Sequence, residues 1–102
     1  MITAVIQVKV TPEAKLGYNG IARIISEFKE VEAVYLMSGG YDFSVMVNCA
    51  DMKQVGKFVS KKISAIKGVA STGTHFIMER YKHSGEILDV FEEEDDRGLF
   101  TI

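Results

Sequence analysis

The residues best suited to chemistry in this 102-residue chain are Gly39, Gly40 and Asp42, which lie between two apolar runs. Adjacent glycines leave backbone N–H groups uncovered by side chains, and such groups can hold an anion. A carboxylate two residues later can hold an ammonium group. Because a free amino acid carries both charges, these residues predict a small zwitterion site. The alternative is a purely structural turn that Asp42 only ties down.

The runs on either side of the two glycines have the character of strands. Residues 32–38 and 41–49 are rich in valine, methionine and aromatic side chains. Two glycines between such runs are typical of a hairpin turn of the primed type, in which φ is positive. We therefore predict a tight hairpin that turns at Gly39-Gly40.

Two further strands are predicted at the ends of the folded region. Residues 3–10 alternate with a period of two, which places Ile6 and Val8 on one face and Gln7 on the other. Residues 69–82 have a similar strand-like composition and are predicted to form the last strand.

Two segments show the helical spacing of apolar residues. The first follows Thr11-Pro12-Glu13, a typical helix start. Gly17 and Gly20 then leave two alternatives open, a late start or close packing against a sheet. The second segment begins at Asp51, which heads a capping-box pattern, and ends at Gly68.

The predicted order of strand, helix, strand, strand, helix, strand indicates an α+β, ferredoxin-like βαββαβ fold. In this fold a four-stranded antiparallel sheet carries two helices on one face, and the third strand lies between the first and the second. The uncovered face would include apolar side chains such as Val5 and Met46. We therefore predict a sheet-to-sheet dimer, with a monomer whose tail covers this face as the alternative.

Composition excludes several classes of protein. The net charge is −2 and no basic cluster is present, so direct binding of nucleic acid by this chain is not expected. No stretch is apolar enough to span a membrane, and no His or Cys spacing suggests a metal or cofactor. The single Cys49 is expected to be a buried hydrophobe in a reducing, cytoplasmic compartment. We divide the chain into a domain over residues 1–83 and a tail over 84–102, which contains five consecutive acids.

Several of these motifs together resemble the effector-binding (RAM) domain of the Lrp/AsnC family of transcription regulators. The resemblance runs from about Ala4 to Lys82. It rests on Val31-Glu32-Ala33-Val34, Ser38-Gly39-Gly40-Tyr41-Asp42-Phe43, Asp51, Phe58-Val59 and Lys67-Gly68-Val69-Ala70-Ser71-Thr72-Gly73-Thr74.

The resemblance implies a ferredoxin-like domain that dimerises through its sheets and assembles further, with octamers common in the family. It also implies an amino-acid effector near the Gly-Tyr-Asp turn. The effector-binding residues carried over by position are Gly39, Gly40, Tyr41, Asp42, Thr72 and Thr74. We expect turn amides and a threonine hydroxyl to hold the carboxylate, and Asp42 or nearby carbonyls to hold the ammonium.

Regulators of this family carry an N-terminal helix-turn-helix domain, whereas this sequence starts at the first strand. The expectation is a stand-alone effector module that acts through a partner, such as a full-length regulator. Two other classes stay open. One is a small enzyme of the dimeric α/β-barrel type, with His75 and Asp42 as candidate catalytic residues. The other is an oligomerisation domain without a ligand.

Overall fold

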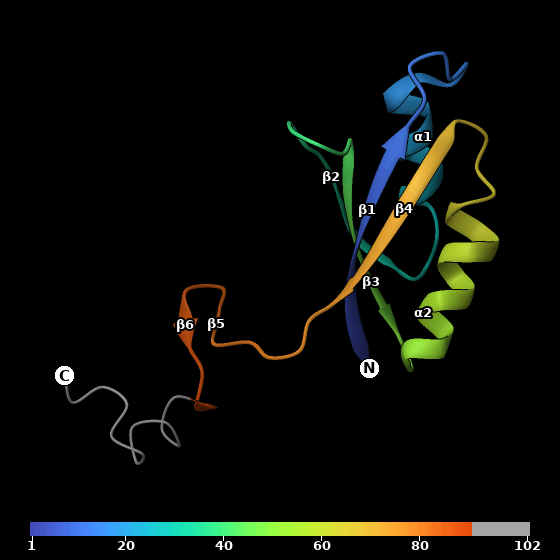
Figure 1. Ribbon diagram of the computed structural model, residues 1–102. Coiled ribbons are helices and arrows are strands. Elements are labelled where there is room, and N and C mark those ends of the chain that lie inside the picture. The colour runs from blue at the N-terminus through green and yellow to red at the C-terminus, as the bar shows by residue number, and fades with distance from the viewer. Residues whose placement is uncertain (91–102) are drawn as a thin grey trace.

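Two helices cover one face of a four-stranded antiparallel sheet in the computed structural model, which describes residues 1–90 (Figure 1). The elements are β1 (Ile2–Val10), α1 (Gly17–Ser26), β2 (Val31–Leu36), β3 (Phe43–Cys49), α2 (Met52–Phe58), a π-helical turn η1 (Val59–Ile63), β4 (Val69–Phe76), β5 (Lys82–His83) and β6 (Glu86–Ile87). The strand order β2-β3-β1-β4 confirms the predicted ferredoxin-like arrangement, and it leaves β2 and β4 as the outer strands.

The core lies between the sheet and the helices, as period-two alternation predicts. In β1, Ile6 and Val8 are fully buried, while Gln7 between them is only partly buried. The helices contribute Ile21 and Ile25 from α1, and a matching stripe from α2 and η1. The full set of buried apolar residues is Ala4, Ile6, Val8, Val10, Ile21, Ile25, Phe43, Val45, Val47, Cys49, Val55, Phe58, Val59, Ile63 and Ile66.

The first helix does not start at Thr11-Pro12-Glu13; it begins at Gly17, the late start that the sequence left open. The residue before α1, Leu16, makes no side-chain capping bond. Gly17, the first residue of α1, has a φ of +66°, outside the right-handed helical region, so the helix does not extend from it back toward Thr11. Thr11 instead donates its backbone N–H to the carbonyl of Gly68 at 2.8 Å, and the segment turns across the end of the sheet.

The second helical segment begins as predicted, because Asp51 accepts a hydrogen bond from the backbone N–H of Gln54 at 2.8 Å. Its helical turns end at Ile63, so the predicted end at Gly68, whose φ is +105°, was wrong. A Cβ atom at this position would lie 2.7 Å from the Cβ of Ala14. Glycine is therefore needed here for its backbone conformation and for the close approach of the β1–α1 segment.

The loop between β2 and β3 is longer than the predicted tight turn. Its closing bond runs from the N–H of Met37 to the carbonyl of Asp42 at 2.8 Å, and only Gly39, at +130°, has a positive φ; Gly40 does not. The prediction of a primed turn at Gly39-Gly40 was therefore wrong. Asp42 also joins the loop to β1, because its own N–H donates to the carbonyl of Val8 at 2.9 Å.

The last strand of the sheet ends at Phe76, six residues short of the predicted Lys82. The chain then forms a small separate hairpin from β5 and β6. Its two-residue turn is Ser84-Gly85, with φ values of 49° and 85°. These values fit a primed turn, which suits the twist of a hairpin.

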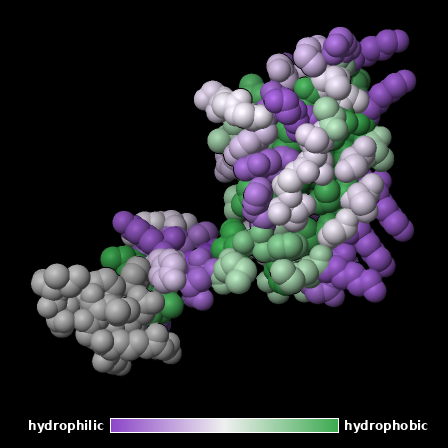
Figure 2. Space-filling view, viewed as in Figure 1, coloured by the Kyte–Doolittle hydropathy of each residue, from purple (hydrophilic) through white to green (hydrophobic). Residues whose placement is uncertain are grey.

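Residues 77–90, here called the arm, project from the rest of the molecule (Figure 1). The Cα radius of gyration is 16.9 Å, whereas a compact chain of 100 residues has about 13 Å. Figure 2 shows a narrow connection between the arm and the body, with hydrophobic residues at the surface of both. The acidic block at 92–96 lies outside the described residues.

Candidate functional site

A surface cavity of about 360 Å³ lies where the β2–β3 loop meets β1 and β4. Its lining residues come from three separate parts of the chain. They are Gln7 and Lys9 of β1, Gly40 and Tyr41 of the loop, and Ser71, Thr72 and Gly73 of β4.

The sheet register explains how β1 and β4 build this cavity. Gln7 pairs with Gly73 and Lys9 pairs with Ser71. Paired residues project to the same face of a sheet, and the neighbours of Gln7 in β1 are buried against the helices. The Gln7 and Lys9 side chains therefore lie on the face away from the helices, here called the open face.

Gly73 shapes the floor of the cavity. A Cβ atom at Gly73 would lie 3.7 Å from Nε2 of His75 and 3.8 Å from Oε1 of Gln7. Because glycine has no side chain, these two polar atoms can converge above the backbone of β4. The floor thus offers hydrogen-bonding groups rather than an apolar surface.

Lys9 is the single charged side chain among the lining residues. Its Nζ donates a hydrogen bond to the carbonyl oxygen of Gly40 at 3.2 Å, which holds the ammonium group beside the loop. A cation surrounded by neutral polar groups favours a carboxylate ligand. Sequence reasoning missed Lys9, which has the pattern of an ordinary solvent-facing strand residue. Its contact with Gly40, 31 positions away, depends on the fold.

Asp42 has partners within the protein. Its Oδ2 accepts a hydrogen bond from the backbone N–H of Val10 at 2.7 Å, and its Oδ1 accepts a longer one from the Tyr18 hydroxyl at 3.5 Å. The Tyr18 ring packs edge-on against Phe43, with centroids 6.1 Å apart. These contacts fasten the loop to the end of β1, which is the structural role raised as the alternative from the sequence.

Thr72 and Thr74 lie on the face of β4 that the helices cover, opposite the open face. Thr72 pairs with Val8 and Thr74 pairs with Ile6, and both partners are buried against the helices. Thr72 still lines the cavity at the outer edge of the sheet, whereas Thr74 is not among the lining residues. Of the six residues carried over from the resemblance, the structure brings Gly40, Tyr41 and Thr72 together.

A larger cavity of about 550 Å³ lies beside the β1–α1 segment. Its walls are Thr11, Glu13, Ala14, Lys15, Leu16, Lys67 and Gly68. It contains none of the Gly-Tyr-Asp loop, and apolar groups form most of its surface. We therefore treat the polar cavity at Lys9 as the candidate site. Lys15, which lines the larger cavity, is the control position in the binding test below.

Other reactive groups in residues 1–90 do not form a centre. No group of three or more His, Cys, Asp or Glu side chains in this range could hold a metal ion. Each helix in the same range is too short or too polar to cross a membrane. Cys49 is buried, and this burial, with the nearby Glu30 and Asp51 carboxylates, raises the pKa of its thiol.

Fold and cavity together define a small ligand-binding module. Residues 3–87 match the family described as the Lrp/AsnC ligand binding domain, and the chain belongs to this family. The recognition made from the Gly-Tyr-Asp loop and the motifs after it is thereby confirmed.

Relatives agree with this assignment. The chain is 50% identical over 95 residues to the uncharacterised HTH-type transcriptional regulator YugG of Bacillus subtilis (strain 168), a match that covers 93% of this chain and 55% of that protein. It is 26% identical over 83 residues to the DNA-binding transcriptional activator DecR of Escherichia coli (strain K12), covering 81% of this chain and 55% of DecR. The chain thus spans about half the length of these curated relatives.

Solved structures share the fold. TTHA0845 from Thermus thermophilus superposes with a TM-score of 0.72 at 25% identity, over 81% of this chain and 100% of that one. The transcriptional regulator NMB0573 of Neisseria meningitidis, solved as a complex with L-Met, has a TM-score of 0.75 at 22% identity, over 85% of this chain and 56% of that one.

Proposed function

We propose that this chain is an amino-acid sensor of the Lrp/AsnC type, which controls transcription in the cytoplasm through partner proteins. The observation that carries the proposal is the Lys9 ammonium group, which lies 3.2 Å from the Gly40 carbonyl within a cavity of neutral polar groups. The L-Met complex of the N. meningitidis regulator supports an amino acid as the ligand class.

The carboxylate of the amino acid would bind Lys9 and the hydroxyl of Ser71. Its ammonium would bind the acceptors beside Lys9, the Gly40 carbonyl and Oε1 of Gln7. A carbonyl oxygen has two lone pairs, so Gly40 can accept from the ligand and from Lys9 at once. The Tyr41 ring would flank the side chain of the ligand.

The other residues carried over from the resemblance would position or enclose the groups that contact the ligand. Gly39 would let the loop take its shape, since its φ is +130°. Asp42 would be a positioning residue, because its carboxylate is bonded to the backbone of Val10. Thr72 would close the cavity at the sheet edge, and Thr74 would lie just beyond it.

We also propose that two chains pair through their open faces. Val5 and Met46 are only partly buried there, and Tyr35 of β2 is 55% exposed. Polar side chains surround them, as in the rim of a protein interface. Dimers would then assemble into larger rings such as octamers, with a full-length family regulator as a further partner.

We propose no catalytic role. An enzyme of the dimeric α/β-barrel type would use His75 and Asp42, but the Asp42 carboxylate is engaged with Val10 and Tyr18. His75 is exposed on the sheet rather than enclosed in a deep cavity. An oligomerisation domain without ligand is the remaining alternative, and a binding experiment separates it from a sensor.

The test is a screen of the common L-amino acids by thermal shift and calorimetry. At least one should raise the melting temperature, because a ligand bound only by the folded state stabilises it. Lys9→Ala should weaken that binding about tenfold or more, the loss of one charge-assisted hydrogen bond. Lys15→Ala, at the larger apolar cavity, is the matched control and should bind like the parent. Equal binding by Lys9→Ala would refute the assigned site.

A further inference from the structure

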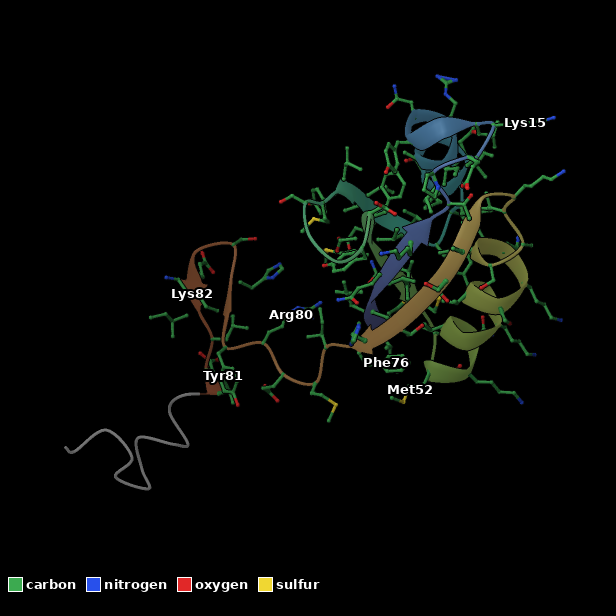
Figure 3. All side chains as sticks on the ribbon, turned by 45° about the horizontal axis from the view of Figure 1, so that its top comes forward. Lys15, Met52, Phe76, Arg80, Tyr81 and Lys82 are labelled. Carbon is green, nitrogen blue, oxygen red and sulfur yellow. The ribbon has the colours of Figure 1, made fainter. Side chains whose placement is uncertain are left out.

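The arm presents large apolar side chains to solvent. Met78 is 88% exposed and Ile87 is 69% exposed. Tyr81, between them in the chain, is 46% exposed. Figure 3 shows Phe76 at the end of the sheet, with Arg80, Tyr81 and Lys82 following along the arm away from it.

The arm nevertheless has a defined backbone. Lys82 pairs with Ile87 and His83 with Glu86, and the N–H of Leu88 donates to the carbonyl of Tyr81 at 2.9 Å. An isolated two-stranded hairpin is at best marginally stable in water. A short hairpin that leaves its apolar side chains exposed therefore needs a surface to pack against.

The body of the same chain leaves Met78 and Ile87 uncovered. The last hydrogen bond that continues the pairing of β4 with β1 joins the N–H of Ile77 to the carbonyl of Thr3 at 3.3 Å. Beyond this bond the chain leaves the sheet. Ile77, Met78, Leu88 and Val90 of the arm line a cavity of about 350 Å³ within the arm itself.

A second cavity lies between the arm and the open face. It has a volume of about 280 Å³ and is lined by Met46 and Leu88 together with polar residues. The polar residues form a row on the sheet side: Thr3 donates to Asn48 at 2.7 Å, and Asn48 donates to Glu32 at 2.9 Å. Apolar and polar groups of the sheet and the arm thus line this cavity together.

We propose that the arm of each chain packs on a second copy of the chain, so that two arms clasp the dimer. The inference rests on the open-face dimer proposed above. The arm begins where β4 ends, at the border of that face, so a copy packed there meets the arm directly. Two-fold symmetry makes the contact reciprocal, so that both arms are buried at once.

The test uses single substitutions in the full chain. Met78→Asp and Ile87→Asp place a charge on the arm, and Met52→Asp is the matched control at an exposed methionine, 52% exposed at the start of α2 (Figure 3). Sedimentation over a wide dilution series should show the dimer dissociation constant raised about tenfold or more by each arm substitution. Met52→Asp should leave it unchanged.

Hydrogen exchange provides a second readout. The Leu88 amide and the β5–β6 amides should be protected at concentrations where the dimer forms and exchange freely after dilution below the dissociation constant. Protection that is equally strong in the monomer would show that the arm is held by its own chain, and would overturn the proposal.

Met46→Asp separates this inference from the dimer on which it depends. If Met46→Asp dissociates the dimer and the arm substitutions do not, the clasp is refuted and the open-face dimer stands. If the arm substitutions disrupt only assemblies larger than the dimer, the arm binds a neighbouring dimer and the clasp is again refuted. A chain that is monomeric at every concentration refutes both, while amino-acid binding is measured independently.

Discussion

The carboxylate of Asp42 and the backbone N–H of Val10 form a 2.7 Å hydrogen bond that joins the β2–β3 loop to the end of β1. Val10 is 6% exposed, so its N–H has little access to water. One side chain thus satisfies a nearly buried donor and fixes the loop that carries Gly40 and Tyr41. The stability of the fold and the shape of the candidate site are linked at this point.

Asp42→Ala should lower the free energy of unfolding by about 1–3 kcal/mol, the cost of leaving a buried donor unsatisfied. Asp42→Asn keeps an oxygen that can accept the same bond, so its loss should be smaller. Urea denaturation measures both values. An alanine variant as stable as the parent would show that water or another group replaces the carboxylate.

Gly73→Val should block the candidate site without unfolding the protein. The added side chain enters the space between Oε1 of Gln7 and Nε2 of His75, which lie 3.8 and 3.7 Å from the Cβ position. Valine itself is favourable in a strand. We expect amino-acid affinity to fall about tenfold or more, with the melting temperature little changed. Gly73→Ala makes only ordinary contacts and should retain binding, so equal binding by the valine variant would exclude this floor from the site.

Gly68→Ala should destabilise the fold by about 2–4 kcal/mol, from backbone strain and overpacking together. The strain arises from the φ of +105°, and the overpacking from a Cβ only 2.7 Å from the Cβ of Ala14. Ala14→Gly added to this variant removes the closer of the two steric contacts, the other being Cδ1 of Ile21 at 3.0 Å. Denaturation of the double variant should therefore recover some of the loss, and full recovery would show that the backbone conformation costs nothing.

Cys49 should make the protein less stable in alkaline solution. Burial first, and then the Glu30 and Asp51 carboxylates, raise the pKa of its thiol in the folded state. As the pH rises above the ordinary thiol pKa, the unfolded chain loses this proton while the folded chain keeps it. The unfolded state then binds fewer protons, and the free energy of unfolding falls.

The measurement compares the parent with Cys49→Ala across the alkaline range. The difference in the free energy of unfolding between them should shrink as the pH rises, because only the parent carries this penalty. All other side chains are the same in the two proteins, so their contributions cancel in the difference. A constant difference at every pH would contradict the raised pKa.

The fold could be predicted because each strand shows its buried face locally. Alternation in β1 marked Ile6 and Val8 as core residues, and the order of elements then determined the position of β3 between β1 and β2. Helix ends were predicted where a side chain makes the cap, as Asp51 does. They were wrong at Thr11-Pro12-Glu13, where the positive φ of Gly17 decides the start.

The details of the site could not be predicted, because they depend on contacts between distant parts of the chain. The sequence drew attention to Gly39-Gly40, but the primed turn occurs at Ser84-Gly85. Thr72 and Thr74 are two positions apart in a strand and so share a face, yet only the pairing of β4 with β1 shows that this face is the helix side. Lys9 became a candidate only when its 3.2 Å contact with Gly40 was known.

The position of β2 at the border of the sheet has a consequence for an isolated chain. One row of its backbone groups is unpaired within the sheet, and Tyr35 and Leu36 are 55% and 64% exposed. Glu32 is the single charge along this strand. Outer strands without lysine or proline attract further strands and can seed fibrils. An isolated chain is thus at risk of aggregation through the unpaired edge of β2.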